Sequence, residues 1–346
     1  MDQIRWGMIG CGDVTEVKSG PALQKAHGSE LVAVMRRNGA LAEDYARRHG
    51  VPRWTDDADA LIHDPDVNAI YIATPPDSHC DYTLRAAEAG KPVYVEKPMA
   101  RTYAECQTMI EACRAANVPL FVAYYRRALP RFLKIKELID SGAIGAVRAV
   151  SMRLFQHARP GPGAPPWRFR PEIAGGGLFV DLGSHMIDFL LYALGPVVEA
   201  QGSAGNQAGW YPAEDIVSAS FTFASGAQGT GLWWFSSPQP LDRTAIYGTQ
   251  GTIVYSCFGT DPVILQRGTT KKRSPSSTRR TSSSRSFKPW WTRCAAAAPA
   301  PAPATPPPKP AASSTRCWTA TGTASRAPDI HDFCGRPHAF DRRGVL

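Results

Sequence analysis

The stretch Ile4-Arg5-Trp6-Gly7-Met8-Ile9-Gly10-Cys11-Gly12 decides the fold, because an apolar run leads directly into two glycines. The run itself is typical of a strand that is buried on both faces. Gly10 would make the tight turn after this strand, and Gly12 would let a pyrophosphate approach the backbone amides. Thr15 stands where the usual fingerprint has a third glycine. The stretch favours a dinucleotide-binding turn over an ordinary strand-to-helix turn.

Outward from this turn, short apolar runs alternate with amphipathic stretches. Strands are predicted over residues 4–9, 31–35, 69–73, 93–95 and 120–123, with helices over 40–49, 77–89 and 103–116. This rhythm is that of a doubly wound parallel sheet, with helices on both faces. We therefore expect an α/β fold that begins with an NAD(P)-binding Rossmann domain over residues 1–124.

The rhythm changes from Pro130 onward. A helix is predicted over residues 131–140 and a strand over 146–155, followed by a Pro/Gly-rich loop and a helix over 181–194. Four alternating segments, 217–223, 228–235, 244–247 and 252–256, then indicate an open, mostly antiparallel sheet with one face against helices. We expect a substrate-binding and oligomerisation α/β domain over residues 125–268.

Charge is distributed unevenly along the chain. Its net charge is +9, but residues 269–346 hold 14 Lys/Arg and 3 Asp/Glu, leaving 25 Lys/Arg and 27 Asp/Glu in residues 1–268. The mildly acidic folded part gives no reason to predict nucleic-acid binding. No apolar run approaches the ~18 residues that would predict a membrane span, and no signal peptide is recognised, so we expect a cytoplasmic protein. The 8 cysteines are scattered without a Cys-x-x-Cys pair, so no metal site is predicted.

Residues 269–346 lose all apolar periodicity and are rich in Ala, Pro, Ser and Arg. This composition predicts a disordered basic tail. A shift of reading frame is a second interpretation, because codons for Pro289-Trp290-Trp291-Thr292 in another frame encode an apolar residue, then Val, then Asp. We hypothesise that the gene is frameshifted near Gly268, with a genuine disordered tail as the alternative.

The end of the predicted strand 31–35 informs the choice of cofactor. An NAD site usually places a carboxylate there to hold the ribose 2′-hydroxyl. This chain instead has Arg36 and Arg37. Guanidinium groups pair with a 2′-phosphate, which a carboxylate would repel. The pair favours NADP over NAD, and the alternative is that both arginines lie on an ordinary surface.

Two further strands end in motifs at the same edge of the predicted sheet. Ala73-Thr74-Pro75 follows one strand, and Glu96-Lys97-Pro98 follows the next. Further along, Gly175-Gly176-Gly177-Leu178 precedes Asp181-Leu182-Gly183-Ser184-His185 and Asp188. Together with the first glycines, these motifs closely resemble the Gfo/Idh/MocA family, named after glucose–fructose oxidoreductase and inositol dehydrogenase. The resemblance covers residues 4–267.

The resemblance implies a catalytic trio of Lys97, Asp181 and His185. Asp181 and His185 are four residues apart, so a helix would place both on one face. His185 is the candidate general base for a hydroxyl proton, Lys97 would polarise that oxygen, and Asp181 would orient the site. Tyr125 and Arg126, with Trp167 and Arg168, are substrate-binding candidates that could equally serve a domain interface. The expected cofactor contacts are Gly10, Cys11, Gly12, Asp13, Val14, Arg36, Arg37, Thr74, Pro75, His79, Glu96 and Lys97.

The sequence therefore predicts an NADP-preferring dehydrogenase that moves a hydride between its cofactor and a secondary hydroxyl of a sugar, cyclitol or related polyol. NAD stays open as the cofactor. Two alternatives stay open as well, a cofactor-binding sensor or regulator of the same fold and an inactive product of a damaged gene. We also expect a homo-oligomer that forms through the second-domain sheet, provided that the C-terminus is intact.

Overall fold

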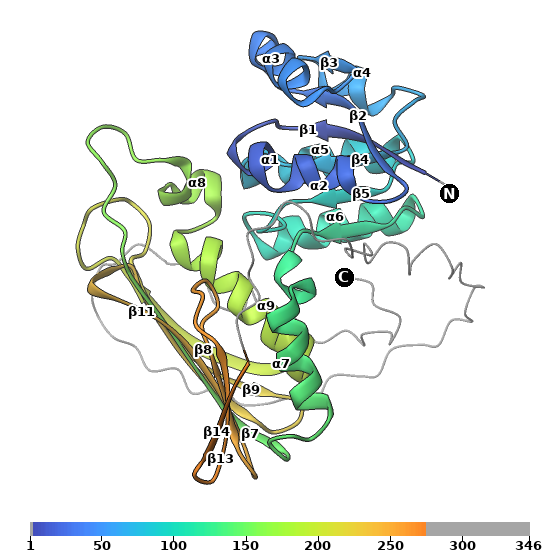
Figure 1. Ribbon diagram of the computed structural model, residues 1–346. Coiled ribbons are helices and arrows are strands. Elements are labelled where there is room, and N and C mark those ends of the chain that lie inside the picture. Colours follow the sequence, from blue (N-terminus) through green and yellow to red (C-terminus); the bar gives the residue numbers. More distant parts are fainter. Residues whose placement is uncertain (1–2, 275–346) are drawn as a thin grey trace, which may run out of the picture.

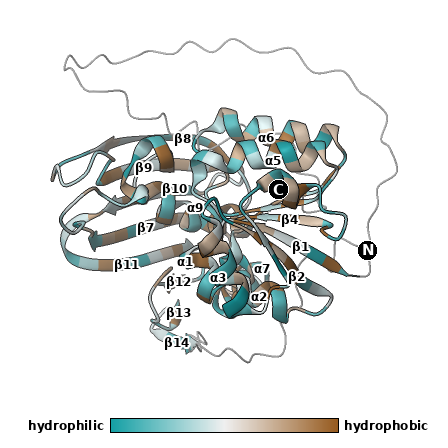
Figure 2. Cartoon of the chain, turned by 90° about the horizontal axis from the view of Figure 1, so that it is seen from above, coloured by the Kyte–Doolittle hydropathy of each residue, from teal (hydrophilic) through white to brown (hydrophobic). Residues whose placement is uncertain are grey.

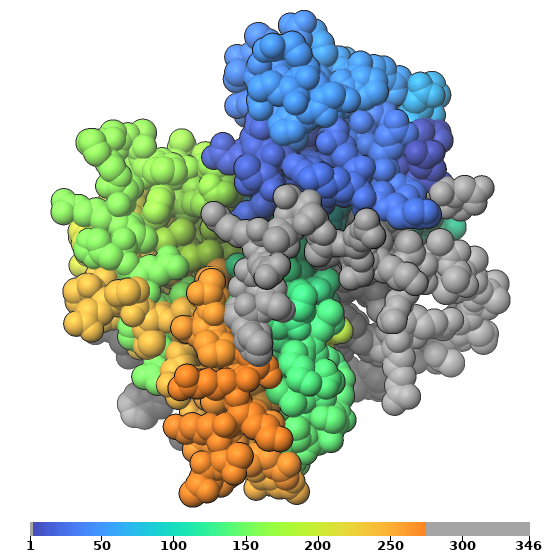
Figure 3. Space-filling view, in the orientation of Figure 1, coloured from blue at the N-terminus to red at the C-terminus, as the bar shows by residue number. Residues whose placement is uncertain are grey.

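The computed structural model describes residues 3–274, which form two domains in contact with each other (Figure 1). Figure 3 shows the first domain, in blue, against the second, in green and orange. Each domain is built around its own sheet. The predicted combination of a Rossmann domain with a second α/β domain is confirmed.

A six-stranded parallel sheet forms the first domain, in the order β3-β2-β1-β4-β5-β6. Its predicted strands are present within a residue or two of their expected bounds, because each is an apolar run buried on both faces. The short third strand was not predicted, since Arg53-Trp54-Thr55 offers no apolar run. The strands are β1 (Ile4–Ile9), β2 (Ser29–Met35), β3 (Arg53–Thr55), β4 (Ala69–Ile72), β5 (Val93–Val95) and β6 (Leu120–Val122).

Helices cover both faces of this sheet, and apolar strands lie between them (Figure 2). One layer holds α1 (Asp13–Val17), α2 (Ser19–Lys25) and α3 (Gly39–His49), whose buried residues pack around Tyr45 and Tyr71. The other layer holds α4 (Ala58–Ile62), α5 (His79–Glu88) and α6 (Tyr103–Ala115), packed around Ile70 and Met109. The short helix η1 (Pro76–Ser78) leads into α5. This is the doubly wound arrangement that the sequence predicts.

An eight-stranded sheet forms the second domain, in the order β14-β13-β12-β11-β7-β10-β9-β8. All neighbours are antiparallel except β7 and β10, which are parallel. The mostly antiparallel sheet is thus confirmed. Its strands are β7 (Val147–His157), β8 (Val197–Gly205), β9 (Ile216–Phe223), β10 (Gln228–Trp234), β11 (Ser236–Gly248), β12 (Thr252–Tyr255), β13 (Val263–Arg267) and β14 (Thr270–Ser274).

Two long helices, α7 (Pro130–Asp140) and α9 (Ser184–Leu194), cover one face of this sheet (Figure 1). Phe132 and Phe189 from these helices pack in one core with Trp233 and Ile246 from the strands. Within residues 3–274 no helix lies over the opposite face. Four short helices complete the domain, η2 (Tyr125–Ala128), η3 (Trp167–Phe169), α8 (Pro171–Ala174) and η4 (Phe179–Gly183).

The segment Pro171–Leu194 differs from its prediction in two ways. Asp181 lies in a π-helical turn, η4, and the regular α-helix begins only at Ser184. The prediction that one regular α-helix carries both Asp181 and His185 on the same face is therefore wrong in detail. The segment is also long and apolar enough to cross a membrane by length and composition, and most of its apolar part is buried in the fold. The sequence predicts no such segment, because Asp181 and Asp188 interrupt its apolar residues.

The boundary predicted at residue 268 is wrong by one strand. Val263–Arg267 and Thr270–Ser274 pair as an antiparallel hairpin, and the turn between them contains Gly268 with φ +54°. The predicted disorder therefore does not hold for residues 270–274. Residues 275–346, on which the remaining tail prediction and most of the frameshift hypothesis depend, lie outside the described residues, and both stay predictions.

Candidate active site

A cleft of about 1920 Å³ runs between the two domains. From the first domain it is lined by residues that follow β1, β2, β4, β5 and β6, the carboxyl edge where ligands bind in open parallel sheets. The second domain contributes η2, η3, η4, α9 and the loop after β12. Nearly all of the predicted site residues therefore meet in one space.

The glycine turn forms one end of the cleft. Gly10 has φ +93°, and a Cβ at this position would lie 2.8 Å from the backbone nitrogen of Thr74. Gly12 has open space where a Cβ would be, so a ligand can approach its backbone closely. Asp13 and Val14 line the cleft in the first turn of α1. This geometry fits a dinucleotide pyrophosphate at the helix N-terminus.

Arg36 and Arg37 line the same end of the cleft, at the end of β2. The Arg36 guanidinium donates a hydrogen bond of 3.0 Å to the carbonyl of Cys11, which ties it to the glycine turn. Arg37 is exposed. Cys11 itself is buried, and burial raises the pKa of its thiol to about 11, so the side chain is a neutral packing group.

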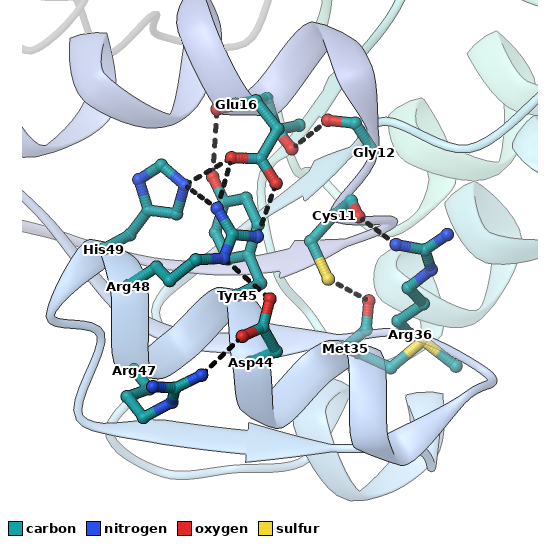
Figure 4. A network of polar contacts seen from close by, with 11 residues as sticks. Cys11, Gly12, Glu16, Met35, Arg36, Asp44, Tyr45, Arg47, Arg48 and His49 are labelled. Carbon is teal, nitrogen blue, oxygen red and sulfur yellow. Dashed lines mark hydrogen bonds and ion pairs between the residues drawn. The ribbon is translucent and has the colours of Figure 1, made fainter.

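An ion-pair cluster fastens α1 to α3 behind the glycine turn (Figure 4). Glu16 accepts hydrogen bonds from Arg48 at 2.7 Å and 2.8 Å and contacts His49 at 2.6 Å. Arg48 also pairs with Asp44 at 2.6 Å. Beside this cluster, the Tyr45 hydroxyl donates to the carbonyl of Thr15 at 2.9 Å. These contacts hold the helix whose N-terminus faces the cleft.

Thr74 and Pro75 line the cleft as predicted, but His79 does not. His79 is 1% exposed and lies behind the cleft wall, with ring nitrogens 2.7 Å from the Thr74 carbonyl and 3.0 Å from the Pro98 carbonyl. The prediction that His79 contacts the cofactor is therefore wrong. Its ring instead connects the two loops that follow β4 and β5, so it positions Thr74 and the Glu96-Lys97-Pro98 segment.

Glu96 lines the floor of the cleft at the end of β5. It accepts a 2.6 Å hydrogen bond from the Tyr71 hydroxyl and a 3.3 Å hydrogen bond from the Lys97 backbone N–H. Burial raises the pKa of this carboxyl. These hydrogen bonds hold the Glu96 side chain within the first domain, whereas the Lys97 side chain reaches the second domain.

Lys97, Asp181 and His185 meet in the cleft, as the resemblance implies. The Lys97 ammonium donates to the Asp181 carboxylate at 2.5 Å and to the Asp181 carbonyl at 3.0 Å. His185 lines the same cleft from the first turn of α9. The contact between Lys97 and Asp181 joins the two domains directly, so an acid, an amine and an imidazole share one site.

His185 is almost enclosed, with 3% of its surface exposed. Tyr124 and Tyr125 pack edge-on against its ring, with centroids 5.7 Å and 5.6 Å away, and its Nδ1 has no hydrogen-bond partner within residues 3–274. Burial, followed by the charges of Lys97, Arg126 and Lys18, lowers the pKa of His185 to about 2. The imidazole is therefore neutral near neutral pH, and a neutral imidazole has one ring nitrogen that can accept a hydrogen bond from a hydroxyl.

All four substrate-binding candidates line the cleft. Arg126 donates to the Cys257 carbonyl at 2.8 Å, and its guanidinium carbon lies 5.4 Å from the Tyr125 ring centroid. Arg168 lies 4.3 Å from the Trp167 ring centroid and 3.5 Å from the Asp181 carboxylate. These residues enclose the trio from both sides.

Among the cleft residues that the sequence did not predict, Lys18 and Phe258 bear on the trio. Lys18 lines the cleft from the break between α1 and α2, and Phe258 lines it from the loop after β12. Phe258 lies 6.2 Å from the His185 ring and 4.3 Å from the Arg126 guanidinium carbon. The position of Lys18, eight residues after Gly10, is a signal in the sequence that could have placed this residue near the cleft. Nothing local pointed to Phe258, because its loop reaches the site only through the tertiary fold.

Family models match both domains. Residues 4–124 match the oxidoreductase family with an NAD-binding Rossmann fold, and residues 132–254 match the GFO/IDH/MocA C-terminal domain. The chain therefore belongs to the GFO/IDH/MocA family of oxidoreductases, as the sequence motifs predict. Its Rossmann domain is of the class that binds a nicotinamide cofactor.

Individual relatives agree with this family. An oxidoreductase of Formosa agariphila is 43% identical over 77% of this chain and 83% of its own length. The scyllo-inositol 2-dehydrogenase (NAD(+)) of Bacillus subtilis is 30% identical over 72% of this chain and 73% of its own. Levoglucosan dehydrogenase in complex with NADH and levoglucosan has a TM-score of 0.71 and 27% identity, over 78% of this chain and 79% of that chain.

Proposed function

We propose that this protein is an NADP-preferring dehydrogenase that transfers a hydride between its cofactor and a secondary hydroxyl of a sugar, cyclitol or related polyol. The observation that carries the proposal is the meeting of Lys97, Asp181 and His185 in a cleft that begins at the glycine turn. Relatives named for levoglucosan, scyllo-inositol and 1,5-anhydro-D-fructose support the substrate class.

The residues of the trio would divide the work between them. A bound nicotinamide cofactor would supply the hydride acceptor. His185 would take the hydroxyl proton, and Lys97 would donate a hydrogen bond to the same oxygen as the carbonyl forms. Asp181 would orient the Lys97 ammonium through the 2.5 Å contact. The apolar rings around His185 keep this imidazole neutral and shielded from water.

Substitution of the trio tests these roles. Lys97→Ala and His185→Ala should each lower turnover by roughly 10²–10⁴-fold, the usual contribution of an acid–base group. Cofactor affinity should change far less, because the glycine turn lies at the other end of the cleft. Steady-state kinetics and cofactor titration by fluorescence separate the two quantities. Near-parental turnover in either variant would show that its assigned role is wrong.

The preference for NADP rests on Arg36 and Arg37, which stand where an NAD site usually has a carboxylate. Replacement of both by alanine should weaken NADP binding selectively, by roughly 10-fold or more. Titration of each cofactor into both proteins measures the effect. Equal losses for NADP and NAD would show that the arginines do not contact the 2′-phosphate.

A panel of polyols and sugars with NADP⁺ distinguishes an enzyme from a cofactor sensor. Reduction of the cofactor, followed by its near-ultraviolet absorbance, is the expected result. Tight cofactor binding without reduction by any substrate would favour the sensor. The ion pair between Lys97 and Asp181, next to His185, supports the enzyme.

We further propose a cytoplasmic homo-oligomer that assembles through the sheet face away from α7 and α9. Phe155 and Trp234 are half-buried, and their rings meet edge-on at 5.8 Å on adjacent strands. They alternate with the buried core residues Leu154 and Trp233, so they belong to the opposite face. Light scattering of wild type and Trp234→Lys tests the oligomer, and a monomer in both would refute it.

A further inference from the structure

The catalytic end of the cleft is rich in cations. Lys18, Lys97, Arg126 and Arg168 all line the cleft, and the charges of Lys18, Lys97 and Arg126 all act on His185. Asp181 is the ion-pair partner of both Lys97 and Arg168. Within residues 3–274, neither Lys18 nor Arg126 forms an ion pair with a carboxylate.

Arg126 is held rigidly but has few hydrogen-bond acceptors. Its Nη1 donates to the Cys257 carbonyl at 2.8 Å, and the Phe258 ring centroid lies 4.3 Å from its guanidinium carbon. Its Nε is buried and has no acceptor among the described residues. A guanidinium has five N–H donors in a planar fork, and carboxylate and phosphate groups match the geometry of this fork. A buried donor without an acceptor is costly, and the other N–H groups of Arg126, which lines the cleft, are available to a ligand with acceptor oxygens.

Lys18 approaches the same end from the other domain. It stands between Val17, the last residue of α1, and Ser19, the first residue of α2, with φ −114° and ψ −80°. The positive charge of Lys18 lowers the pKa of His185 and opposes the burial that raises the pKa of Glu96. Lys18 and Arg126 therefore line the same cleft from different domains.

The carboxylates in this region are already engaged. Asp181 contacts Lys97 and Arg168, whereas Glu96 accepts from the Tyr71 hydroxyl and the Lys97 backbone. Among residues 3–274, Lys18 and Arg126 are cations of the cleft that pair with no carboxylate, although Arg126 donates one hydrogen bond to the Cys257 carbonyl. A polyol hydroxyl both donates and accepts, but a carboxylate only accepts. The match in hydrogen bonding and in charge favours an anionic ligand.

We propose that Lys18 and Arg126 form an anion subsite, and that the substrate is a sugar acid, an aldonate or uronate, whose carboxylate binds there. The oxidised hydroxyl is on a different carbon of the same molecule. This inference rests on the proposed dehydrogenase function and narrows its substrate class. Because one cation comes from each domain, the subsite exists only where the two domains meet.

Matched substrates that differ at one carbon test the subsite. Galacturonate against galactose, and gluconate against glucitol, are offered to the full-length protein with NADP⁺ and with NAD⁺. We expect kcat/KM to favour the acid of a pair by at least about 10-fold, and Arg126→Gln to remove most of this ratio. Arg126→Lys keeps the charge and should keep part of the ratio. Arg114→Gln, an exposed arginine in the last turn of α6, is the matched control and should leave the ratio unchanged.

Lys18→Gln has a second readout. If Lys18 binds the substrate, this variant lowers the acid-to-neutral ratio and leaves the cofactor dissociation constant within about 3-fold of wild type. Equal losses for acid, neutral sugar and cofactor would show that Lys18 holds the pyrophosphate instead, and would refute the two-cation subsite. Neutral sugars oxidised as well as their acids by the wild type would also refute it, while leaving the proposed dehydrogenase intact.

Absence of turnover on every compound would count against the proposed function rather than against the subsite. Calorimetric titration of galacturonate and galactose into the cofactor complex then decides the subsite on its own. Tighter binding of galacturonate, lost in Arg126→Gln, supports the inference. Equal affinities, or a preference that survives in Arg126→Gln, overturn it.

Discussion

Replacement of His185 by asparagine should change how the stability of the protein depends on pH. His185 is 3% exposed, and its pKa falls from 6.5 to about 2 in the fold, first because of burial and then because of the charges of Lys97, Arg126 and Lys18. In the unfolded chain the imidazole recovers its ordinary pKa. Below pH 6.5 the unfolded state therefore binds a proton that the folded state does not.

The sign and size of the effect follow from this difference. Because the unfolded state binds more protons, the free energy of unfolding must fall as the pH falls below 6.5. The slope contributed by one such group approaches about 1.4 kcal/mol per pH unit. Between about pH 6.5 and pH 4.5 the wild type should lose about 2 kcal/mol from this residue alone. Asparagine has no proton to bind in this range, so His185→Asn lacks this contribution.

Urea unfolding of both proteins at several pH values, without cofactor, measures the difference between the two curves. His79 is buried and its pKa is also lowered, but it is present in both proteins and cancels in the comparison. The variant should become more stable relative to wild type as the solution is acidified. Parallel curves would contradict the reasoning, since they would mean that folded His185 takes up a proton at its ordinary pKa and is not held neutral by its surroundings.

Two predictions concern the supports of the site. Glu16→Gln should lower the free energy of unfolding by about 1 kcal/mol near neutral pH, and the effect is no larger because the Arg48 partner is partly exposed. Arg48 lowers the pKa of Glu16 from 4.5 to about 2. The difference between variant and wild type, measured by urea unfolding, should therefore disappear as the pH falls from 4.5 to about 2. Asp242→Ala removes the carboxylate that accepts from the backbone N–H groups of Cys257, Phe258 and Gly259 at 2.8, 2.6 and 2.8 Å. The free energy of unfolding of this variant should fall by about 2–4 kcal/mol. Its KM for the substrate should rise, because Phe258 moves and so does Cys257, whose carbonyl accepts a hydrogen bond from Arg126. An unchanged KM in the folded variant would exclude this loop from the substrate site.

Sequence alone predicts the Rossmann domain well because each long strand is an apolar run between clear helix and turn signals. It misses β3, β8, β13 and β14, whose sequences are short or polar and form strands because a neighbouring strand offers backbone partners. Val197–Gly205, for example, is mostly exposed along its length. Strands at the edge of a sheet therefore depend more on their neighbours than on their own pattern.

The site shows the same division between local and tertiary information. Lys97, Asp181 and His185 were found because each belongs to a recognisable motif, although the π-helical turn at Asp181 was not visible in the sequence. His79 was misplaced, because the same loop can direct a side chain into the cleft or behind it. Phe258 was missed, since only the fold of the loop held by Asp242 and Arg131 brings this ring to His185.

The most direct measurement of the central claim follows the hydride itself. A sugar or polyol that reduces NADP⁺ in the panel is prepared with deuterium on the carbon of its oxidised hydroxyl, and the reduced cofactor is analysed by mass spectrometry. Direct transfer predicts that the deuterium appears in the cofactor, and that Lys97→Ala and His185→Ala form the labelled cofactor far more slowly. Reduced cofactor without deuterium, or labelling at the same rate in both variants, would contradict the account.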